Sequence, residues 1–581
     1  MPRVIRTWPV AVLVSVSVGQ AATPLQTLAP APGPAHLLVE DGTARGSIVL
    51  PQGADELEQH AANELQRYVK TMTGVTLQIV SEPERPAGYG IWLGRTEAAR
   101  SAGFTLTESR LGRDGYAAEA TDKDLVIVGR CPIGTLFGVY DLIEREFGVR
   151  WCEPDKKLGE VVPTGKTLSV GSFRREFKPS FDYRWVGDGD WALKQRMNVK
   201  VTVNGKPVGV NWKWHFHTFR TLIPPEEYFD KRPEWFPLIG GTRRKPKDKS
   251  SLDTQLCTSN PQVVAKLVEG LLQALDADPT IEIITLSPND GGGFCECPNC
   301  KALDEPGRGW FARYSKRLAV LNEQIAKRVA ERYPQVKIKV GAYAMYAELP
   351  GIEGYKPAPN LIVHLCHLHF CHNHPITGGR CQAGKTYHLP IGNFLPNQEF
   401  AELLKRWRSV TDNLFIYEYY ALGGWSKEKL LWPMVHTMRH DLPWYRQMGV
   451  KGFYTQVGPW PRAPLNDYIA AKLAWNADLD VDWLIDDFCR RFFQEAADPM
   501  RRYLLGIEEA MVRCNQCISY GLVDGLAKAA GPRVFGKGTL EELRSFLDQA
   551  AQQATTDPVR HRIAAVRKAF DECERSVSAM K

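Results

Sequence analysis

Residues 281–300, IEIITLSPNDGGGFCECPNC, are the stretch from which the fold of this chain is inferred. They open with a run of branched apolar residues, which is typical of a strand buried on both faces of a parallel sheet. The run stops at Ser287-Pro288, and Asn289 and Asp290 follow directly. Barrel enzymes keep their chemistry just beyond the carboxyl ends of their strands, so Asp290 is a candidate catalytic carboxylate. The alternative is an aspartate that only caps a turn.

Three glycines and three cysteines follow Asp290, and the cysteines are Cys295, Cys297 and Cys300. The glycines let the backbone turn tightly and let another group approach it closely. Together with Cys257, the cysteines predict either disulfides or a structural zinc site, because four thiolates complete the tetrahedral shell of zinc. The CxCxxC spacing differs from the paired CxxC of a zinc ribbon, and a catalytic thiol is a third alternative. Either form of cross-link would stiffen the loop that carries Asp290.

The composition indicates a globular protein of more than one domain. The chain has 581 residues, which is too long for a single core. Its hydrophobic fraction of 44% and its 16 tryptophans suit a globular protein with large cores. The formal net charge of +7 is small for this length. The basic block RRKPKDK at residues 243–249 is best explained as a solvated loop. We therefore expect no nucleic-acid partner.

The amino terminus predicts export. Arg3 and Arg6 form a basic region, residues 8–18 an apolar core, and residues 19–21 a small-residue cleavage site. The apolar run is too short to span a membrane, and no other segment is long enough. We therefore expect residues 1–21 to be a signal peptide, residues 22–35 a Pro/Ala-rich linker, and the mature protein to be secreted or periplasmic. The number of cysteines, 13, is odd, so at least one thiol cannot pair within the chain.

Residues 36–173 predict a small α/β domain. One helical face runs from Leu57 to Met72 and ends at Gly74, and a second helix begins at Pro132. Short apolar strands are expected at residues 77–80, 91–93 and 125–128. This part of the sequence contains no catalytic cluster, so its expected role is to pack against the next domain.

Residues 180–485 alternate strand and helix patterns, which predicts a (β/α)₈ TIM-type barrel rather than an open sheet with a dinucleotide fingerprint. Strands are expected at residues 181–186, 199–203, 254–257, 281–287, 336–343, 361–367, 414–420 and 450–457. Helices are expected near residues 190–197, 261–275, 310–332, 398–411, 432–447 and 466–476. Residues 486–581 predict an α-helical C-terminal region.

The residues that follow these strands are carboxylates, imidazoles and aromatics, without a nucleophilic serine elbow or a phosphate loop. Cleavage of a glycosidic bond needs two carboxyl groups, one as acid and one as base, nucleophile or charge stabiliser. Asp290 and Glu418 are the expected catalytic pair. Glu418 has an alternative as an inward-facing barrel residue paired to an arginine. The expected substrate-binding residues are Arg184, His215, His217, Asn289, Tyr343, Tyr419, Trp425 and Trp460.

A histidine-rich segment, residues 364–374, raises the question of a metal. His367, His369, His372 and His374 would supply imidazole ligands, but strand alternation alone accounts for His367 and His369 on one face. We expect catalysis to require no cofactor, with structural zinc at the Cys257 group as the one metal under consideration.

Four segments resemble the domain-of-unknown-function family 4838, a bacterial group related to glycoside hydrolases. They are LIPPEEYFDKRPEWFPL (222–238), QLCTSNPQVV (255–264), SPNDGGGFCECPNC (287–300) and LAWNADLDVDWLIDDFCRRFF (473–493). Upstream, YVKTMTG (68–74) and FGVRWCEPDKKLGEVVP (147–163) are similar to the α/β domain that precedes the barrel in β-hexosaminidases and α-glucuronidases. The resemblance implies a catalytic barrel and a carbohydrate substrate.

Related hexosaminidases carry an acidic pair after the fourth strand, where this chain has Asn289 and Asp290. The carboxyl group is kept at the second position only, so the substrate-assisted mechanism of those enzymes does not carry over as it stands. Arg184 in FDYRWVG is placed like an arginine that grips sugar hydroxyls in those relatives. The expected function is an exported glycoside hydrolase. The alternatives are a non-catalytic carbohydrate-binding protein and metal-dependent hydrolysis through the histidines.

Overall fold

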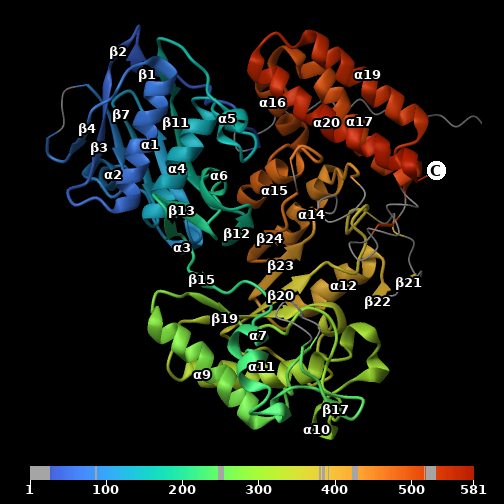
Figure 1. The fold of residues 1–581 in the computed structure, drawn as a ribbon. Helices are drawn as coiled ribbons and strands as arrows, with labels where there is room; N and C mark the ends of the chain where they lie inside the picture. Colours follow the sequence, from blue (N-terminus) through green and yellow to red (C-terminus); the bar gives the residue numbers. More distant parts are fainter. Residues whose placement is uncertain are drawn as a thin grey trace, which may run out of the picture.

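The structure is a computed structural model that describes residues 26–580, except 85–87, 247–253, 379–380, 382–386, 390–391, 422–428, 459, 516 and 519–530. The predicted signal peptide lies outside the described residues, as does the start of the predicted linker. Three parts follow one another along the chain and lie side by side in space (Figure 1). They are an α/β layer, a parallel sheet with its helices, and a group of C-terminal helices.

The first part is a six-stranded sheet of order β11-β6-β7-β5-β3-β4, in which β11 and β6 run antiparallel to their neighbours. Its strands are β3 (Gly46–Leu50), β4 (Ile79–Ser81), β5 (Tyr89–Leu93), β6 (Tyr116–Ala120), β7 (Asp124–Gly129) and β11 (Phe173–Phe177). A smaller sheet contains β1 (Ala35–Glu40), β2 (Thr43–Ala44) and β10 (Leu168–Gly171). The expected strands at 77–80, 91–93 and 125–128 correspond to β4, β5 and β7.

Two helices, α1 (Glu56–Thr73) and α4 (Pro132–Arg145), pack against each other beside this sheet. The side chain of Asp55 caps α1 and Glu58 completes a capping box, which satisfies donors that the first turn leaves open. The helix ends at Gly74, whose φ of 80° is the left-handed conformation that glycine adopts without strain. Both helices were predicted from the sequence, as was the position of Pro132 in the first turn of α4.

The second part is a curled, entirely parallel sheet of seven strands in the order β12-β24-β23-β20-β19-β18-β15. Its strands are β12 (Tyr183–Val186), β15 (Trp212–Lys213), β18 (Ile283–Thr285), β19 (Lys337–Ala342), β20 (Leu361–Cys366), β23 (Leu414–Glu418) and β24 (Gly452–Thr455). Because the first strand pairs with the last, the order is that of a barrel opened between β12 and β15.

Two strand predictions are wrong. Residues 254–257 form no strand, and Val201–Val203 (β13) pairs with Lys206–Val208 (β14) in a separate hairpin. The neighbour of β18 is instead β15, so the strand at 283–285 is third along the chain in this sheet, not fourth. Val199 forms an isolated parallel bridge to Val210 and donates its N–H to the carbonyl of Arg184, so this short segment lies between β12 and β15.

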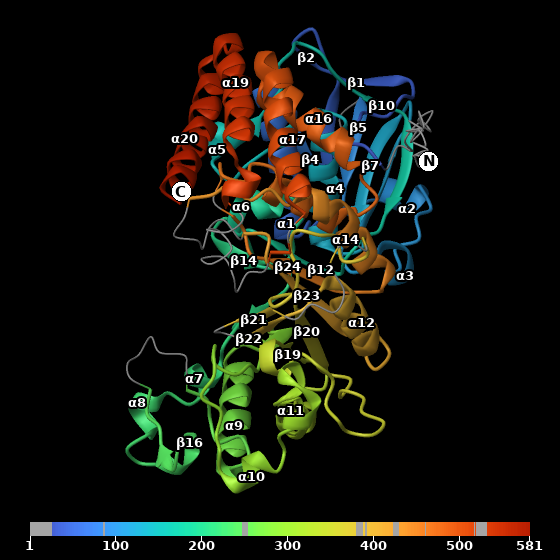
Figure 2. The same ribbon diagram turned by 90° about the vertical axis from the view of Figure 1, so that its right-hand side faces the viewer.

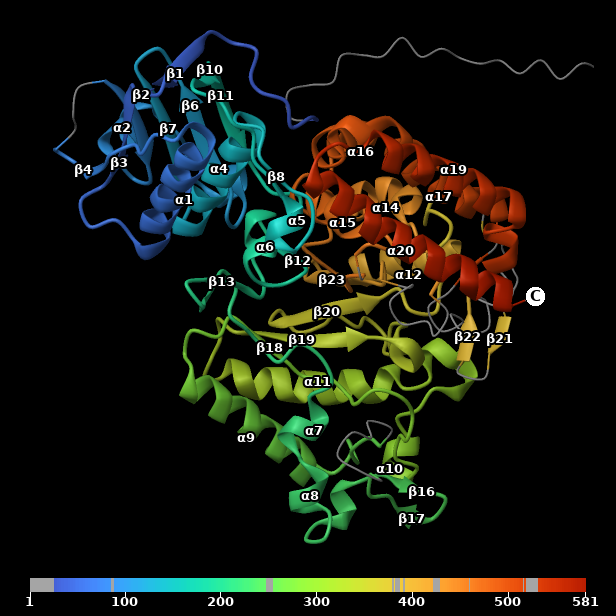
Figure 3. The same cartoon turned by 45° about the horizontal axis from the view of Figure 1, so that its top comes forward.

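The helices that alternate with these strands agree with the sequence prediction. They are α6 (Gly189–Lys194), α9 (Pro261–Ala277), α11 (Ser315–Ala330), α12 (Asn397–Arg408), α14 (Val435–Gln447) and α15 (Asn466–Trp475). Figure 3 shows α9 and α11 together along one side of β18, β19 and β20. This alternation brings the loops after the strands to one edge of the sheet, where function is expected.

The C-terminal part is helical, with α16 (Val481–Phe492), α17 (Ala497–Cys514), α19 (Lys537–Gln553) and α20 (Asp557–Ala579). These helices lie beside the first α/β layer in two views (Figures 1 and 2). Arg150 donates to Asp487 at 2.6 Å, which ties the α/β layer to α16 through a buried ion pair. Among the described residues, no helix is long and apolar enough to cross a membrane.

Candidate functional site at the carboxyl ends of the strands

Asp290 lies in the loop after β18 and is exposed. Its Oδ1 accepts a hydrogen bond from the Tyr343 hydroxyl at 3.0 Å and one from the Gly291 N–H at 3.0 Å. Burial, with the charge of Asp290 second, raises the pKa of Tyr343 well above its usual range, so this hydroxyl stays protonated and donates. Asp290 is therefore an oriented, solvent-accessible carboxylate at the end of a buried strand.

Tyr343, which follows β19, connects Asp290 to residues from three other strand ends. The His217 ring lies 6.5 Å from the Tyr343 ring, and its Nδ1 is 2.9 Å from the carbonyl oxygen of Pro288. On its other side, Tyr343 packs against a cluster that contains Cys366, Leu368 and Tyr419. The structure thus brings together His217, Asp290, Tyr343 and Tyr419, four of the residues predicted from the sequence.

Asn289 holds the loop in place. Its N–H donates to Gln255 Oε1 at 2.9 Å, its side-chain amide donates to the Thr254 carbonyl at 2.8 Å, and its Oδ1 accepts from the Arg220 N–H at 3.0 Å. In these contacts the side chain of Asn289 bonds to backbone groups, and the residue is buried. The structure therefore gives Asn289 a positioning role beside Asp290 rather than the predicted contact with substrate.

Glu418 does not lie across a pocket from Asp290. Its neighbour Tyr417 points to the concave face of the sheet, 5.0 Å from Phe216 and 4.5 Å from Tyr454 between ring centres. Alternation along β23 then turns Glu418 to the opposite face, toward α12 and α14. There its carboxylate accepts from the Tyr445 hydroxyl and pairs with His367 at 3.1 Å, fully buried. The alternative of an inward-facing residue paired to an arginine is also wrong, because Glu418 faces the helices and its partners are His367 and Tyr445.

The predicted contact of Arg184 with substrate is also corrected, because Arg184 faces the α/β layer. It is fully buried, and its two terminal nitrogens donate to both carboxylate oxygens of Asp114 at 3.0 and 2.8 Å. Its Nε donates to the Arg196 carbonyl at 2.9 Å. Four of the five N–H donors of this guanidinium are used within the protein, the fourth by the Phe181 carbonyl, and the side chain is fully buried. Arg184 therefore joins two parts of the fold rather than binding a sugar.

We expect Arg184→Met to cost about 3–5 kcal/mol of unfolding free energy, because it leaves the Asp114 carboxylate buried without its partner. Urea unfolding measures this. Arg174→Met is the control, since Arg174 pairs with Glu119 at the surface and its loss should cost about 1 kcal/mol or less. Weaker glycan binding by Arg184→Met at unchanged stability would return Arg184 to the binding site.

His215 packs against two tryptophans. Its ring lies 4.5 Å from the Trp185 ring and 5.8 Å from the Trp212 ring. Burial, assisted by Lys200 and Lys339, lowers the pKa of His215 to about 3, so the ring is neutral near pH 7. It lines a cavity of about 920 Å³ together with Asp188, Lys200 and Trp212, at the opening between β12 and β15.

Of the two predicted tryptophans, the structure describes Trp460. Trp425 lies outside the described residues. Trp460 follows β24 and packs edge-on against Phe492 of α16, with the ring centres 6.1 Å apart. This contact with a C-terminal helix gives Trp460 a packing role.

The four predicted cysteines form one buried group, here called the Cys257 cluster (Cys257, Cys295, Cys297 and Cys300). Their sulfur atoms all lie within 4.8 Å of one another, and Cys257 Sγ is 3.7 Å from Cys297 Sγ and 4.0 Å from Cys300 Sγ. A tetrahedral zinc ion with Zn–S bonds of about 2.3 Å places its sulfurs about 3.8 Å apart, whereas a disulfide needs about 2.05 Å. The Leu238 N–H points at Cys295 Sγ at 3.3 Å, as in an outer shell that orients thiolates. The residues fit zinc, and all four thiols are free in the structure.

The histidines of residues 364–374 do not form one metal site. His367, His372 and Glu418 lie within 4.8 Å of one another. However, both ring nitrogens of His367 already have partners, Glu418 and Asn397 Oδ1, the latter at 3.0 Å. His369 packs 4.8 Å from the Trp310 ring instead. His374 belongs to a different group, described below.

Two further residues, Gln456 and Asp467, lie at this edge of the sheet, and of these the sequence analysis missed Asp467. Gln456, after β24, donates to the Tyr417 hydroxyl at 2.9 Å. The tyrosines at the end of β23 are thereby linked to the end of β24. Asp467, in the first turn of α15, accepts from the Gly458 N–H at 3.1 Å, and burial raises its pKa to about 7. In the sequence Asp467 looks like an ordinary first-turn acid, so only its burial distinguishes it.

The parallel sheet with its flanking helices has a glycoside hydrolase-like fold. The chain belongs to the family described as "Domain of unknown function (DUF4838)", whose model matches residues 156–505. A second model, "Glycosyl hydrolase family 67 N-terminus", matches residues 41–142. No curated protein matches the chain.

Solved structures that are similar to this chain include the following two. One is a family GH115 4-O-methyl-α-glucuronidase, with 13% identity and a TM-score of 0.53 over 92% of this chain and 76% of that one. The other is a GH20 β-N-acetylhexosaminidase from Streptomyces coelicolor A3(2), with 15% identity and a TM-score of 0.45 over 83% of this chain and 97% of that one. At these identities the likeness concerns the fold.

Proposed function

We propose that this protein is an exported glycoside hydrolase that cleaves a glycosidic bond with Asp290 as the proton donor. The observation that carries the proposal is the position of Asp290, exposed at the carboxyl end of a buried parallel strand and oriented by the Tyr343 hydroxyl. The family, the glycoside hydrolase-like fold and the match to a family 67 N-terminus support a carbohydrate substrate. A complete (β/α)₈ barrel, with the segment at Val199 in place of one strand, is part of the same proposal.

A general acid must carry its proton when the substrate arrives. The Asp290 side chain is exposed, so the bound glycan itself has to cover the carboxyl group and disfavour its charged form. Tyr343 then positions the carboxyl group at the leaving oxygen. His217 and the exposed part of the loop after β18 are available to contact sugar hydroxyls.

Because Glu418 faces the helices, a different residue is proposed for the second carboxyl group. Asp467 is the carboxyl group at the same edge of the sheet whose raised pKa suits proton transfer near neutral pH. Comparing Asp467→Asn with Glu418→Gln separates them. The catalytic partner should lower turnover with retained stability, whereas loss of Glu418 should lower stability, because it leaves His367 and Tyr445 without their buried partner.

The test of the proposal is a screen of the purified protein on aryl glycosides and glycans, including uronides, because one structural match, with a TM-score of 0.53, is a glucuronidase. Release of sugar that depends on Asp290 supports hydrolysis. The second candidate function is carbohydrate binding without catalysis, which the absence of a second carboxylate in contact with Asp290 favours among the described residues. Saturable glycan binding with no product would establish it.

Export is proposed from the amino-terminal sequence alone. We expect the mature chain to begin near Ala22, because signal peptidase cleaves after small residues such as those at 19–21. N-terminal sequencing of the protein isolated from its own cells measures this, with a cytoplasmic protein from the same cells as a fractionation control. An intact Met1 on the native protein would contradict export.

A further inference from the structure

Three cysteines and a histidine meet at a second place in the fold, here called the His374 cluster (Cys371, His374, Cys381 and Cys517). The first three lie in the loop after β20, and Cys517 follows α17, more than 130 residues later. The sulfur atoms of Cys371, Cys381 and Cys517 lie 3.3, 3.5 and 3.7 Å from His374 Nδ1. All four ligand atoms are within 4.8 Å of one another.

These distances match a metal shell. With Zn–S bonds of about 2.3 Å and a Zn–N bond of about 2.05 Å, a tetrahedral ion places each sulfur about 3.6 Å from the nitrogen. Three sulfurs around one nitrogen at similar distances are what a common central ion requires. A disulfide would instead bring two sulfurs to about 2.05 Å and leave the third cysteine and the histidine without a role.

The surroundings of His374 prepare its Nδ1 to be a ligand. Its other nitrogen, Nε2, lies 3.1 Å from Asn515 Oδ1, an acceptor that holds the ring proton on Nε2. Nδ1 then carries the lone pair and faces the three sulfurs. Metal-bound histidines typically donate their second nitrogen to a carbonyl or carboxylate in this way. The backbone is fixed as well, since the Asn397 amide donates to the His374 carbonyl at 2.7 Å.

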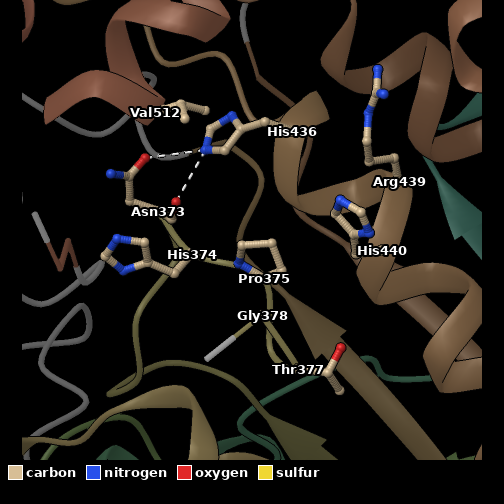
Figure 4. A pocket seen from close by; sticks show the side chains of 9 residues that line it. All are labelled: Asn373, His374, Pro375, Thr377, Gly378, His436, Arg439, His440 and Val512. Carbon is tan, nitrogen blue, oxygen red and sulfur yellow. Dashed lines mark hydrogen bonds between the residues drawn. The ribbon is translucent and has the colours of Figure 1, made fainter. Parts of the chain in front are cut away.

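The His374 cluster lies where two segments that are distant in the sequence contact each other. The His372 N–H donates to the Ile518 carbonyl at 2.6 Å, and the Asn373 side chain donates to the Met511 carbonyl at 3.2 Å. Figure 4 shows this loop between α14, which carries His436, and α17, which carries Val512. His436 Nε2 lies 3.1 Å from both Asn373 oxygens and ties α14 to the same loop.

We propose that Cys371, His374, Cys381 and Cys517 bind one structural zinc ion that fastens the segment after α17 to the loop after β20. Cys371, His374 and Cys381 are buried and Cys517 is half-buried, so four protein ligands close the shell and leave no position for water or substrate. Since the ion closes a loop of more than 130 residues, it removes much conformational freedom from the unfolded chain. It also holds the segment that continues from His367 and Leu368 at the strand-end site.

The experiment is metal analysis of the purified full chain, wild type and single variants, by mass spectrometry of the metal and of the intact protein. We expect Cys517→Ser to lose one equivalent of zinc relative to wild type while keeping the metal of the Cys257 cluster. Cys514→Ser, three residues away and outside the cluster, should keep the wild-type content. Cys300→Ser together with Cys517→Ser should lose one equivalent more than Cys517→Ser alone.

A second readout does not depend on variants that fold. In wild-type protein, alkylation of Cys371, Cys381 and Cys517 under native conditions should increase after a chelator removes the metal, as peptide mapping measures. X-ray absorption at the zinc edge of wild-type protein should show nitrogen beside sulfur among the ligands. Unchanged zinc content in Cys517→Ser, or a disulfide among these three cysteines in non-reduced protein, would overturn the proposal.

Discussion

Replacing Asp290 by asparagine is expected to lower kcat on a glycan with a poor leaving group by about two to four powers of ten, the usual share of a general acid. The amide keeps the shape of the side chain and can still accept from the Tyr343 hydroxyl and the Gly291 N–H, so the loop and ligand binding should survive. Aryl glycosides with good leaving groups need less protonation, and their hydrolysis should fall less. Steady-state kinetics on both substrate types measures the difference.

The matched control is Asp278→Asn. Asp278 precedes the same strand at its amino end, and its Oδ1 accepts from the Thr280 N–H at 3.0 Å and from the Thr280 hydroxyl at 2.6 Å, much as Asp290 accepts from a backbone N–H and a hydroxyl. Its substitution should leave kcat near the wild-type value. Near wild-type turnover by Asp290→Asn on a substrate with a poor leaving group would remove Asp290 from the chemistry.

Loss of the Cys257 cluster is expected to cost several kcal/mol of unfolding free energy, because the binding energy of a structural zinc is also folding energy. Cys300→Ala removes one ligand, and we expect it to lose one equivalent of metal. Turnover should fall too, since Gln255 and Asn289 exchange hydrogen bonds two residues from Cys257 and next to Asp290. Metal analysis, thermal unfolding and kinetics on one preparation measure all three.

Cys489→Ala is the control for the packing of a buried thiol. Cys489 is as buried as Cys300 but lies in α16, outside both metal clusters. Removing its sulfur leaves only a small cavity, at a cost of about 1–2 kcal/mol. Equal destabilisation by Cys300→Ala and Cys489→Ala, with unchanged metal content, would show that the Cys257 cluster is not a metal site.

Regular elements of this protein follow from local patterns. Apolar runs bounded by glycine or proline located β18, β19, β20, β23 and β24, and helical periodicity located α1, α4, α9 and α12. These signals are local, because a buried strand or a buried helix face requires apolar residues at its own spacing along the chain. That spacing does not depend on which other elements pack against it. β15 was missed because two residues leave no period to detect, and 254–257 was mistaken for a strand because its buried residues pack in a loop.

At the site, the sequence was informative where the function of a residue depends on its place along a strand. Asp290, Tyr343 and His217 were expected from strand ends and lie together. Glu418 was expected from the same rule, but the rule does not say which face of β23 the side chain occupies. Arg184 shows the same limit, because its partner, Asp114, belongs to another part of the chain.

The sequence by itself determined the strand–helix alternation, the family and the grouping of Cys257 with Cys295, Cys297 and Cys300, since a short spacing keeps three of these thiols together in any fold. Only the tertiary structure decided which buried charges pair, which carboxylates reach the open edge of the sheet, and that Cys517 meets His374. Those outcomes depend on contacts between segments far apart in the sequence, 70 residues for Arg184 with Asp114 and 143 for Cys517 with His374. A pairing at such a distance leaves no period or spacing in the chain.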